Sequence, residues 1–587
     1  MAIKIDSVQK GYYKAKIGDV ILTNRTTERK AKDDGINYCL EHNLDSYTIL
    51  FPDLVEVSLD GLDEPTEPEP PIDEEPIDEE PPIDEPPIDE EPKTSSYYTL
   101  IDPLAEGIVE GVIDEAQSIL NKASLNKLIL DVKADGFDGL EIGAIDAYFF
   151  SGEELTDVNT RRSLAIRIPS DFHLKMSDDT YLRQQPHEKG ESIFMSIHKS
   201  TNVKITGGNM LGDRYEHDYI TNFPNRASHE NNVMLVVGGS QNVIIDNVSI
   251  KDATGDCFVA GSSGGLRYKE GTVYNQNIII RNCTFDGARR NNISLTDGDG
   301  IIVENCSIIN AGLGEQPQAY LDGLEPPTSA GVLPRCGLDI EPFLGWDKET
   351  ESVVYYERVE NVIVRGNDFT NNAWTAFTQY SGEHVLVENN TGDNSFGCAY
   401  GHDTKFINNT IIANPEIARG NGLTDGSSSL FEFRGNTVSG FNTAMVFNGS
   451  EGIVTGNTLT CTNGTTIRVD GAHNYLIEDN DCSGGLISAY QSEGSVTFKN
   501  NRVMGVFNRP ISCILSNTTQ KAIDNNYTLI FDGNTFEATA TEGAYSFFDN
   551  VNDNTVIKNN TFINHDIYAQ NCNPIQINNT INGVLVP

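Results

Sequence analysis

The sequence predicts an all-β fold, a right-handed parallel β-helix, preceded by a small N-terminal β-rich domain and an acidic, proline-rich linker. A short β-type phrase that ends in a polar turn recurs along the C-terminal two-thirds of the chain. The copies are rich in β-branched residues and Asn and have no helical period. Most neighbouring copies lie roughly 20 to 26 residues apart, which is typical of a solenoid with one coil per repeat. Examples are NVIIDNVSI from Asn242, NIIIRNCTF from Asn277, GIIVENCSI from Gly300 and NTVIKNNTF from Asn554.

Alternating residues in each copy are apolar, such as Val243 and Ile245. Alternation places one set inside and the other in water, and stacked coils bury what a single coil cannot. The turn asparagines tolerate left-handed backbone and can bond one another in a ladder. An antiparallel sandwich is the alternative, but Asn-Gly hairpin turns at fixed spacing are not evident. The turn residues are Asn247, Asn282, Asn305, Asn390, Asn409, Asn457, Asn500 and Asn560.

The charge of the chain limits its partners. A net charge of −45 over 587 residues repels nucleic acid and anionic membranes, so neither is an expected partner. No stretch has the apolar length of a membrane span, and the N-terminus lacks the apolar core of a signal peptide. We therefore expect an intracellular protein or one released by another route, such as lysis. Among the ten Cys, those at coil-like spacing are expected to be buried thiols rather than disulfides or zinc ligands: Cys257, Cys283, Cys306 and Cys336.

The composition divides the chain into four parts. Residues 1–60 contain VILTNRT, YTILFP and VEVSL, which predict a small β-rich anchoring domain. Residues 61–95 are so rich in Pro and acidic residues that we expect an extended, disordered spacer. Residues 96–200 form a lead-in, and residues 201–587 form the β-helix. In the lead-in, a helix starting near Glu106 would cap the open end of the solenoid; its expected apolar stripe is Ile108, Val112, Ile113, Ala116, Ile119 and Leu120.

Four strand-like pieces between residues 212 and 342 carry most of the charged residues that are candidates for a functional site. They are SHENNVMLV from Ser228, TGDCFVAG from Thr254, ARRNNISLT from Ala288 and PRCGLDIEPF from Pro334. Matching their apolar residues points Val233/Leu235, Phe258/Ala260, Ile293/Leu295 and Leu338/Ile340 inward. Asp339 and Glu341 then face outward, and the adjoining corners hold Glu230, Asp256, Arg290 and Arg335. Since stacked strands lie about 4.8 Å apart, these residues are expected to converge on one face.

The predicted cluster has the residues for acid–base chemistry. Asp339 and Glu341, two apart on a strand, would be separated by roughly 6.5 to 7 Å, which leaves room for a water as inverting glycosidases require. Crowding raises the pKa of one carboxyl, which suits a general acid. Asp256 is the third catalytic candidate, and Arg290 would hold the substrate or keep a carboxylate ionised. The alternative is that these acids only solvate an outer strand face.

Other polar residues nearby are weaker candidates. His217, in GDRYEHDY, is a candidate for a proton or hydrogen bond to substrate, and Asp252 precedes the second piece. Asp297 and Asp299, in TDGDG, are typical of a turn, with a calcium site as the alternative. No other cofactor is expected.

At these residues the chain resembles the pectate-lyase-like right-handed parallel β-helix proteins. The resemblance covers residues 100–587 for the fold and 212–342 for the motifs GDRYEH, HENNVMLVVGG, ARRNNISLTDGDG and GLDIEPF. That group includes glycoside hydrolases, polysaccharide lyases, uronan epimerases and phage tailspike depolymerases. The resemblance implies a polysaccharide partner and a carbohydrate groove lined by Glu230, Asp256, Arg290, Asp339 and Glu341. Asn231 and Asn232 depart from the usual pattern of aromatic or Gly residues.

The N-terminal arrangement also resembles a phage tail protein. An anchoring domain, a stiff spacer and a β-helix without a signal peptide fit a virion spike that becomes extracellular after lysis. The resemblance implies a homotrimer attached to virion tail or baseplate proteins through residues 1–60. The leading hypothesis is a tail-associated depolymerase that hydrolyses a host surface polysaccharide.

Two other functions stay open. A lyase or C5-epimerase acting on uronate polymers needs a base and a cation beside the carboxylate. Arg289, Arg290 and Arg335 could supply the cation, although no Tyr or Lys base is evident beside them. The third possibility is a receptor-binding or structural tail component that binds glycan without cleaving it.

Overall fold

The computed structural model describes two compact units, residues 1–82 and 83–587. In the second unit it describes residues 96–586 except 154–164, 222–227, 264–271, 348–351, 419, 491–494, 506–510, 518–527, 540–544, 550, 552–553 and 571. In the first unit it describes two antiparallel pairs: β1 (Tyr13–Ile17) with β2 (Val20–Arg25), and β3 (Ser46–Leu50) with β4 (Leu54–Ser58). Strands thus occur at all three segments for which the sequence predicts them, whereas the predicted spacer lies outside the described residues.

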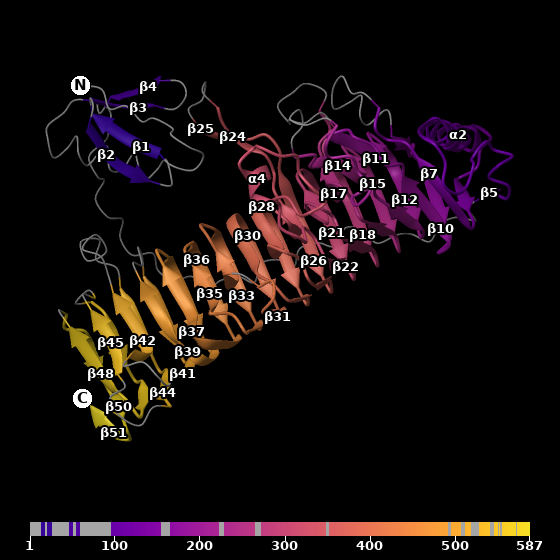
Figure 1. The fold of residues 1–587 in the computed structure, drawn as a ribbon. Helices are drawn as coiled ribbons and strands as arrows, with labels where there is room; N and C mark the ends of the chain where they lie inside the picture. The colour runs from indigo at the N-terminus through magenta and orange to yellow at the C-terminus, as the bar shows by residue number, and fades with distance from the viewer. Residues whose placement is uncertain are drawn as a thin grey trace. The chain divides into compact units, whose positions relative to one another are not determined.

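The second unit is a right-handed parallel β-helix (Figure 1). Each coil runs through three faces, and each strand pairs in parallel with its counterpart one coil along. The first face holds β8 (Ile166–Arg167), β11 (Glu191–His198), β14 (Asn231–Gly238), β17 (Asp256–Gly261), β20 (Ile293–Leu295), β23 (Cys336–Ile340), β32 (Asn421–Asp425), β35 (Thr443–Phe447), β42 (Ile511–Asn517), β45 (Tyr545–Asp549) and β48 (Asp566–Gln570). It also takes parts of four long strands that turn a corner: β28 (Thr375–Glu388), β30 (Phe396–Ile407), β37 (Thr458–Asp470) and β39 (Asp481–Tyr490).

The other two faces complete each coil. The second holds β5 (Tyr97–Leu100), β6 (Gly139–Ile142), β9 (Phe172–Met176), β12 (Thr201–Thr206), β15 (Gln241–Asp246), β18 (Gln276–Arg281), β21 (Gly298–Glu304), β26 (Val359–Arg365), β33 (Ser429–Arg434), β36 (Ser450–Thr455), β38 (His473–Glu478), β40 (Val496–Lys499), β43 (Leu529–Asp532), β46 (Val556–Lys558) and β49 (Ile575–Ile577). The third holds β7 (Ile145–Phe149), β10 (Thr180–Gln184), β13 (Asn209–Leu211), β16 (Ser249–Lys251), β19 (Thr284–Asp286), β22 (Ser307–Ile309), β27 (Asp368–Phe369), β29 (Thr391–Gly392), β31 (Thr410–Ile412), β34 (Thr437–Ser439), β41 (Arg502–Gly505), β44 (Thr535–Ala538), β47 (Thr561–Ile563) and β50 (Asn579–Ile581). Outside the coils lie the hairpin β24 (Leu344–Asp347) with β25 (Ser352–Tyr355), and β51 (Val584–Val586), which pairs antiparallel with β50.

The turn between the second and third faces uses Asn as predicted. The backbone of Asn247, Asn282, Asn305 and Asn500 is left-handed at this turn. In the coils after Cys306, the buried residue at this turn is an Asn. Its backbone N–H and its side-chain amide both donate to the side-chain oxygen of the Asn at the same position in the next coil. We call this row the asparagine ladder; its members are Asn367, Asn390, Asn409, Asn436, Asn457, Asn480, Asn501, Asn534, Asn560 and Asn579.

Earlier coils place Val248, Cys283 and Cys306 at the ladder position, all buried. The four Cys singled out in the sequence are free and buried, as predicted.

The helix of the lead-in differs from its prediction. α2 spans Glu115–Ala134, begins at the N-cap Asp114 and packs on β6, β7 and β8. Gly107 and Gly111 have φ near +79° and +78°, which ends any helix before Asp114. The predicted stripe was therefore wrong: its members Val112, Ile119 and Leu120 are exposed. The buried face is Ser118, Asn121, Lys122, Leu125, Leu128, Ile129 and Val132. In the described part of the chain no helix is long and apolar enough to cross a membrane.

The register of the first face decides which residues meet. Phe258 pairs with Ile293 and Ile293 with Leu338, as predicted. The predicted register of the first piece was wrong by two residues, because Leu235, not Val233, pairs with Phe258. Leu235 stays in the core as predicted, but the prediction for Val233 was wrong: it pairs with Asp256, is only partly buried and packs with Val236 and Val259 outside the main core. A slip of one residue would have reversed the whole strand.

Candidate functional site

The candidate site lies on the outer side of the first face. Leu338 and Ile340 point into the core, so the alternation of β23 turns Asp339 outward. Asp339 lies in register with Ser294 on β20 and Thr378 on β28. The stacking of coils thus brings residues far apart in sequence onto one row.

Arg290 is the centre of the cluster. Its Nη1 lies 2.8 Å from Asp256 Oδ2, and its Nη2 lies 3.5 Å from Glu341 Oε2. Glu341 follows the end of β23 and its side chain is about half exposed (47%), whereas Asp256 is buried. The structure therefore brings Arg290, Asp256, Asp339 and Glu341 together.

Two neighbours of Arg290, which the sequence reading missed, fix the carboxylates. Asn291 donates from its backbone N–H to Asp256 Oδ1 at 3.0 Å and from its side chain to Asp339 Oδ2 at 3.1 Å. Ser294 donates to Asp256 Oδ2 at 2.8 Å. Ser294 could have been found, since it occupies the strand position one coil before Asp339.

The charges in the cluster perturb one another. Burial, and then the negative charge of Glu341, raise the pKa of Asp339 to about 7. Burial alone would lower the pKa of Arg290, but Asp256, Asp339 and Glu341 together raise it. Arg290 thus stays charged, while Asp339 exchanges its proton near neutrality, as a general acid requires.

Glu230 approaches the cluster from the preceding coil. A side chain at Gly255 would collide with the backbone oxygen of Glu230, because a Cβ there would lie 2.3 Å from it. The glycine therefore allows the chain before β14 to pack against the start of β17. The negative charge of Glu230 also raises the pKa of Arg290.

The other two arginines of the prediction point elsewhere. Arg335 is buried, and its guanidinium bonds Glu315 and the carbonyl oxygen of Gly314. Arg289 is fully buried; it donates to the carbonyl oxygens of Thr328 and Ser228 and lies over the Tyr219 ring. In the structure both arginines hold loops.

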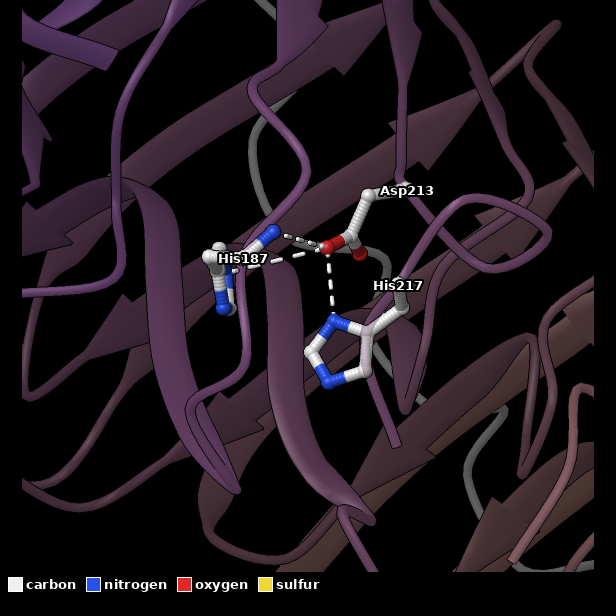
Figure 2. A group of neighbouring side chains, drawn as sticks. All are labelled: His187, Asp213 and His217. Atoms are coloured by element: carbon white, nitrogen blue, oxygen red, sulfur yellow. Dashed lines mark hydrogen bonds and ion pairs between the residues drawn. The ribbon is translucent and has the colours of Figure 1, made fainter. Parts of the chain in front are cut away.

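His217 belongs to a second, buried cluster. A turn after β13 places it four residues beyond Asp213, and its Nδ1 lies 2.6 Å from Asp213 Oδ2. Its Nε2 lies 2.9 Å from His229 Nδ1. Figure 2 shows Asp213 between His217 and His187. Within the described residues, His187, Asp213 and His217 are the group whose atoms could hold a metal ion.

The residues of the predicted calcium alternative bond protein groups. Asp297 lies at a bend and accepts from the backbone N–H of Arg358, and Asp299 accepts from Asn361. Asp252 lies after β16, and burial raises its pKa.

Exposed aromatic rings continue the face beyond Glu341. Gln379 pairs with Ile340, so Tyr380 lies one coil from Glu341. Tyr380 and Tyr400 meet edge to face with centroids 5.4 Å apart, and both are about half exposed. Aromatic faces beside carboxylates are suited to stacking on sugar rings.

The fold and this face define a parallel β-helix with an acidic cluster on its surface. No protein-family model matches the chain. The uncharacterized protein YclG of Bacillus subtilis (strain 168) is 30% identical over 446 residues, covering 71% of this chain and 72% of YclG. The chain therefore belongs to the same family as YclG. The SPbeta prophage-derived uncharacterized protein YorA of the same organism is 27% identical over 343 residues, covering 57% of this chain and 54% of YorA.

Solved structures with a similar course of the chain include three proteins at 12% identity. The catalytic unit of an α-1,3-glucanase from Streptomyces thermodiastaticus has a TM-score of 0.37, covering 76% of this chain and 69% of that one. The A-module of the mannuronan C-5 epimerase AlgE6 from Azotobacter vinelandii has a TM-score of 0.35, covering 83% and 98%. The Dettilon tailspike protein has a TM-score of 0.35, covering 80% and 68%.

Proposed function

We propose that the chain binds and hydrolyses a polysaccharide at the cluster of Asp256, Arg290, Asp339 and Glu341. One observation carries the proposal: a single arginine contacts two of three neighbouring carboxylates, while the pKa of the third, Asp339, is raised to about 7. A carboxylic acid and a carboxylate held side by side are the minimal equipment of a glycosidase.

The proposed step is an inverting hydrolysis. Asp339 donates its proton to the glycosidic oxygen as the bond from that oxygen to the anomeric carbon breaks. Glu341 accepts a proton from a water whose oxygen bonds the anomeric carbon from the opposite side. Asp256 holds Arg290 through their ion pair, and Glu230 and Arg290 position the sugar.

The charge of the site favours hydrolysis over uronate chemistry. A lyase or epimerase must neutralise the substrate carboxylate, but Arg289 is buried and Arg335 is paired with Glu315. Arg290 already faces Asp256 and Glu341. The face therefore suits a neutral or cationic glycan, with Tyr380 and Tyr400 as stacking partners.

A virion tail is the proposed location. The similarity to a prophage-derived protein supports it, as does the predicted spacer after the N-terminal β-rich segment. A homotrimer attached through residues 1–60 is part of the proposal. Mass spectrometry of purified virions from the host strain and light scattering of the purified protein check these two points.

The catalytic proposal is tested with purified protein and surface polysaccharide from the host. We expect new reducing ends, and a loss of about 10²–10⁴-fold in their rate of release in Asp339→Asn and in Glu341→Gln. The matched control is Asp481→Asn, an exposed carboxylate on β39, which should keep full activity.

Three other results would contradict hydrolysis. Products with an unsaturated, ultraviolet-absorbing sugar indicate a lyase. Inversion at C5 without cleavage indicates an epimerase. Binding without cleavage by the unsubstituted protein indicates a receptor-binding component.

A further inference from the structure

A second group of polar side chains lies buried beneath the loop that follows β13. His187 Nε2, Asp213 Oδ2 and His217 Nδ1 all lie within 4.8 Å of one another, and the three side chains are fully buried. His187 Nε2 is 3.9 Å from Asp213 Oδ2, too far for a hydrogen bond, whereas His217 Nδ1 is 2.6 Å from the same oxygen. Figure 2 shows both interactions ending on that one oxygen, together with a hydrogen bond of 3.4 Å from the backbone N–H of His187.

Each of the three side chains is also held from behind. Thr254 donates to Asp213 Oδ1 at 2.7 Å, and the backbone N–H of Lys189 donates to His187 Nδ1 at 3.2 Å. His217 Nε2 lies 2.9 Å from His229 Nδ1. A ligating histidine commonly donates its second N–H to such an outer partner, and His217 is placed to do so toward His229. At His187 the Nδ1 atom accepts instead, so Nε2 binds an ion only once the ring proton moves to Nδ1 and the Lys189 N–H turns away.

Hydrogen bonds already hold the Asp213 carboxyl group. It accepts from Thr254 and from the backbone N–H of His187, and His217 Nδ1 lies 2.6 Å from its Oδ2. A cation bound here would add a positive charge beside this buried carboxyl group. Two buried arginines nearby, Arg214 and Arg289, donate to backbone carbonyls instead.

A cavity borders the group on the side of Asp213. It has a volume of about 150 Å³, and Gln184 and Asp213 form part of its wall. Glu216 and Asp252 line it as well, together with the rings of Tyr148 and Tyr215. Its one arginine, Arg183, is paired with Asp146. The acidic lining favours cations over anions in this cavity.

We infer that His187, Asp213 and His217 bind a divalent transition metal ion of the zinc class. Two imidazole nitrogens and one carboxylate oxygen are a ligand set that such ions prefer, whereas Ca²⁺ and Mg²⁺ prefer oxygen alone. Bonds of about 2.0 to 2.2 Å require ligand atoms roughly 3 to 3.5 Å apart. Shifts of less than about 1 Å at His187 and His217 reach this spacing. The Gln184 amide, 3.0 Å from His187 Nε2, moves aside or turns its oxygen to the ion.

The test uses the full chain, stripped with a chelator and titrated with ZnCl₂ by calorimetry, with CoCl₂ as a spectroscopic probe. We expect one tight site per chain, a higher Tm with Zn²⁺, little response to Ca²⁺ or Mg²⁺, and cobalt absorption bands typical of nitrogen and oxygen ligands. Asp213→Asn and His187→Gln should each weaken Zn²⁺ binding by at least about 100-fold. His473→Gln, on β38 far along the chain, is the control and should bind as the unsubstituted protein does.

X-ray absorption of the zinc-loaded, unsubstituted protein keeps the test decisive if the buried variants fail to fold. It should show two imidazole ligands. Absence of binding, a spectrum with fewer than two imidazoles, or binding unchanged in folded Asp213→Asn overturns the inference; the group is then an Asp213–His217 ion pair or hydrogen bond. The outcome is independent of whether the protein cleaves a glycan.

Discussion

The site coils, residues 191–342, and the ladder coils, residues 359–581, share one architecture but use polar side chains in opposite ways. In the ladder coils, buried Asn side chains repeat the same neutral bond at every turn. In the site coils, the ladder position holds Cys or Val, and the buried polar groups include charged side chains such as Asp256, Arg289 and Asp339. Along the row that contains Asp339, the ladder coils carry Thr378, Gly397 and Thr424.

The difference separates what the scaffold needs from what a site needs. A repeated neutral bond satisfies every donor without a net charge, so it serves stability. A cluster of carboxylates around one arginine is costly to bury, and such clusters with raised pKa values are typical of functional sites. The proposed chemistry therefore belongs to the site coils, whereas the ladder coils serve as scaffold.

Removing the central cation should give the largest effect on stability. Arg290→Met leaves Asp256 buried without its ion pair, and we expect a loss of about 3 to 5 kcal/mol in the free energy of unfolding. Arg502→Met removes an exposed ion pair with Asp481 in the ladder coils and should cost less than about 1 kcal/mol. Urea denaturation of both variants checks the difference; equal losses would contradict the proposed division between the two regions.

Breaking the ladder should have the next largest effect. Asn457→Ala removes the acceptor of the backbone and side-chain N–H groups of Asn436 and the side-chain donor to the carbonyl oxygen of Phe433. We expect a loss of about 2 to 4 kcal/mol in the free energy of unfolding. Cys306→Ala, at the same turn position in the site coils, keeps its backbone bond to Asn367 and should cost only about 1 kcal/mol. Denaturation midpoints measure both. A costlier Cys306→Ala would show that the row of thiols is as important as the ladder.

The pH dependence of stability should show the smallest of the three differences between the two regions. The folded pKa of Asp339 is raised to about 7 from an ordinary value of about 3.9. Between these values the unfolded chain has lost the proton that the folded chain keeps, so stability falls as the pH rises through this window. Asp339→Asn should therefore gain about 1 to 3 kcal/mol relative to the unsubstituted protein between pH 5 and pH 8. Asp481→Asn should show no such gain, and a gain in both variants would refute the assignment to Asp339.

Most of the fold could be predicted because one repeat predicts many coils. The alternation in each copy gives the faces, and the Asn of many turns gives the left-handed corner, which other coils form with Gly, as at Gly366 and Gly435. The stripe of α2 was misjudged because apolar residues before Asp114 mimic a helical period in a segment with left-handed glycines. Such a segment has no repeat to correct it.

Sequence analysis could predict only those site residues whose positions follow from the register of the strands. Asp339 and Ser294 occupy equivalent strand positions, so alignment brings them together. Arg289 and Arg290 are neighbours in sequence, yet only one reaches the carboxylates, because the other is held by loop carbonyls. The contact of His187 with Asp213 depends on how a long loop folds back, which no spacing in the sequence expresses.

The asparagine ladder determines which deletions and insertions the β-helix can tolerate. Every rung receives a bond from one neighbour and passes an equivalent bond to the other. Excising one whole coil would leave two rungs that match each other, whereas excising part of a coil would turn core side chains toward water. The β-helix can thus lose or gain whole coils in its ladder region. Its length can change in this way without disturbing the acidic cluster of the site coils.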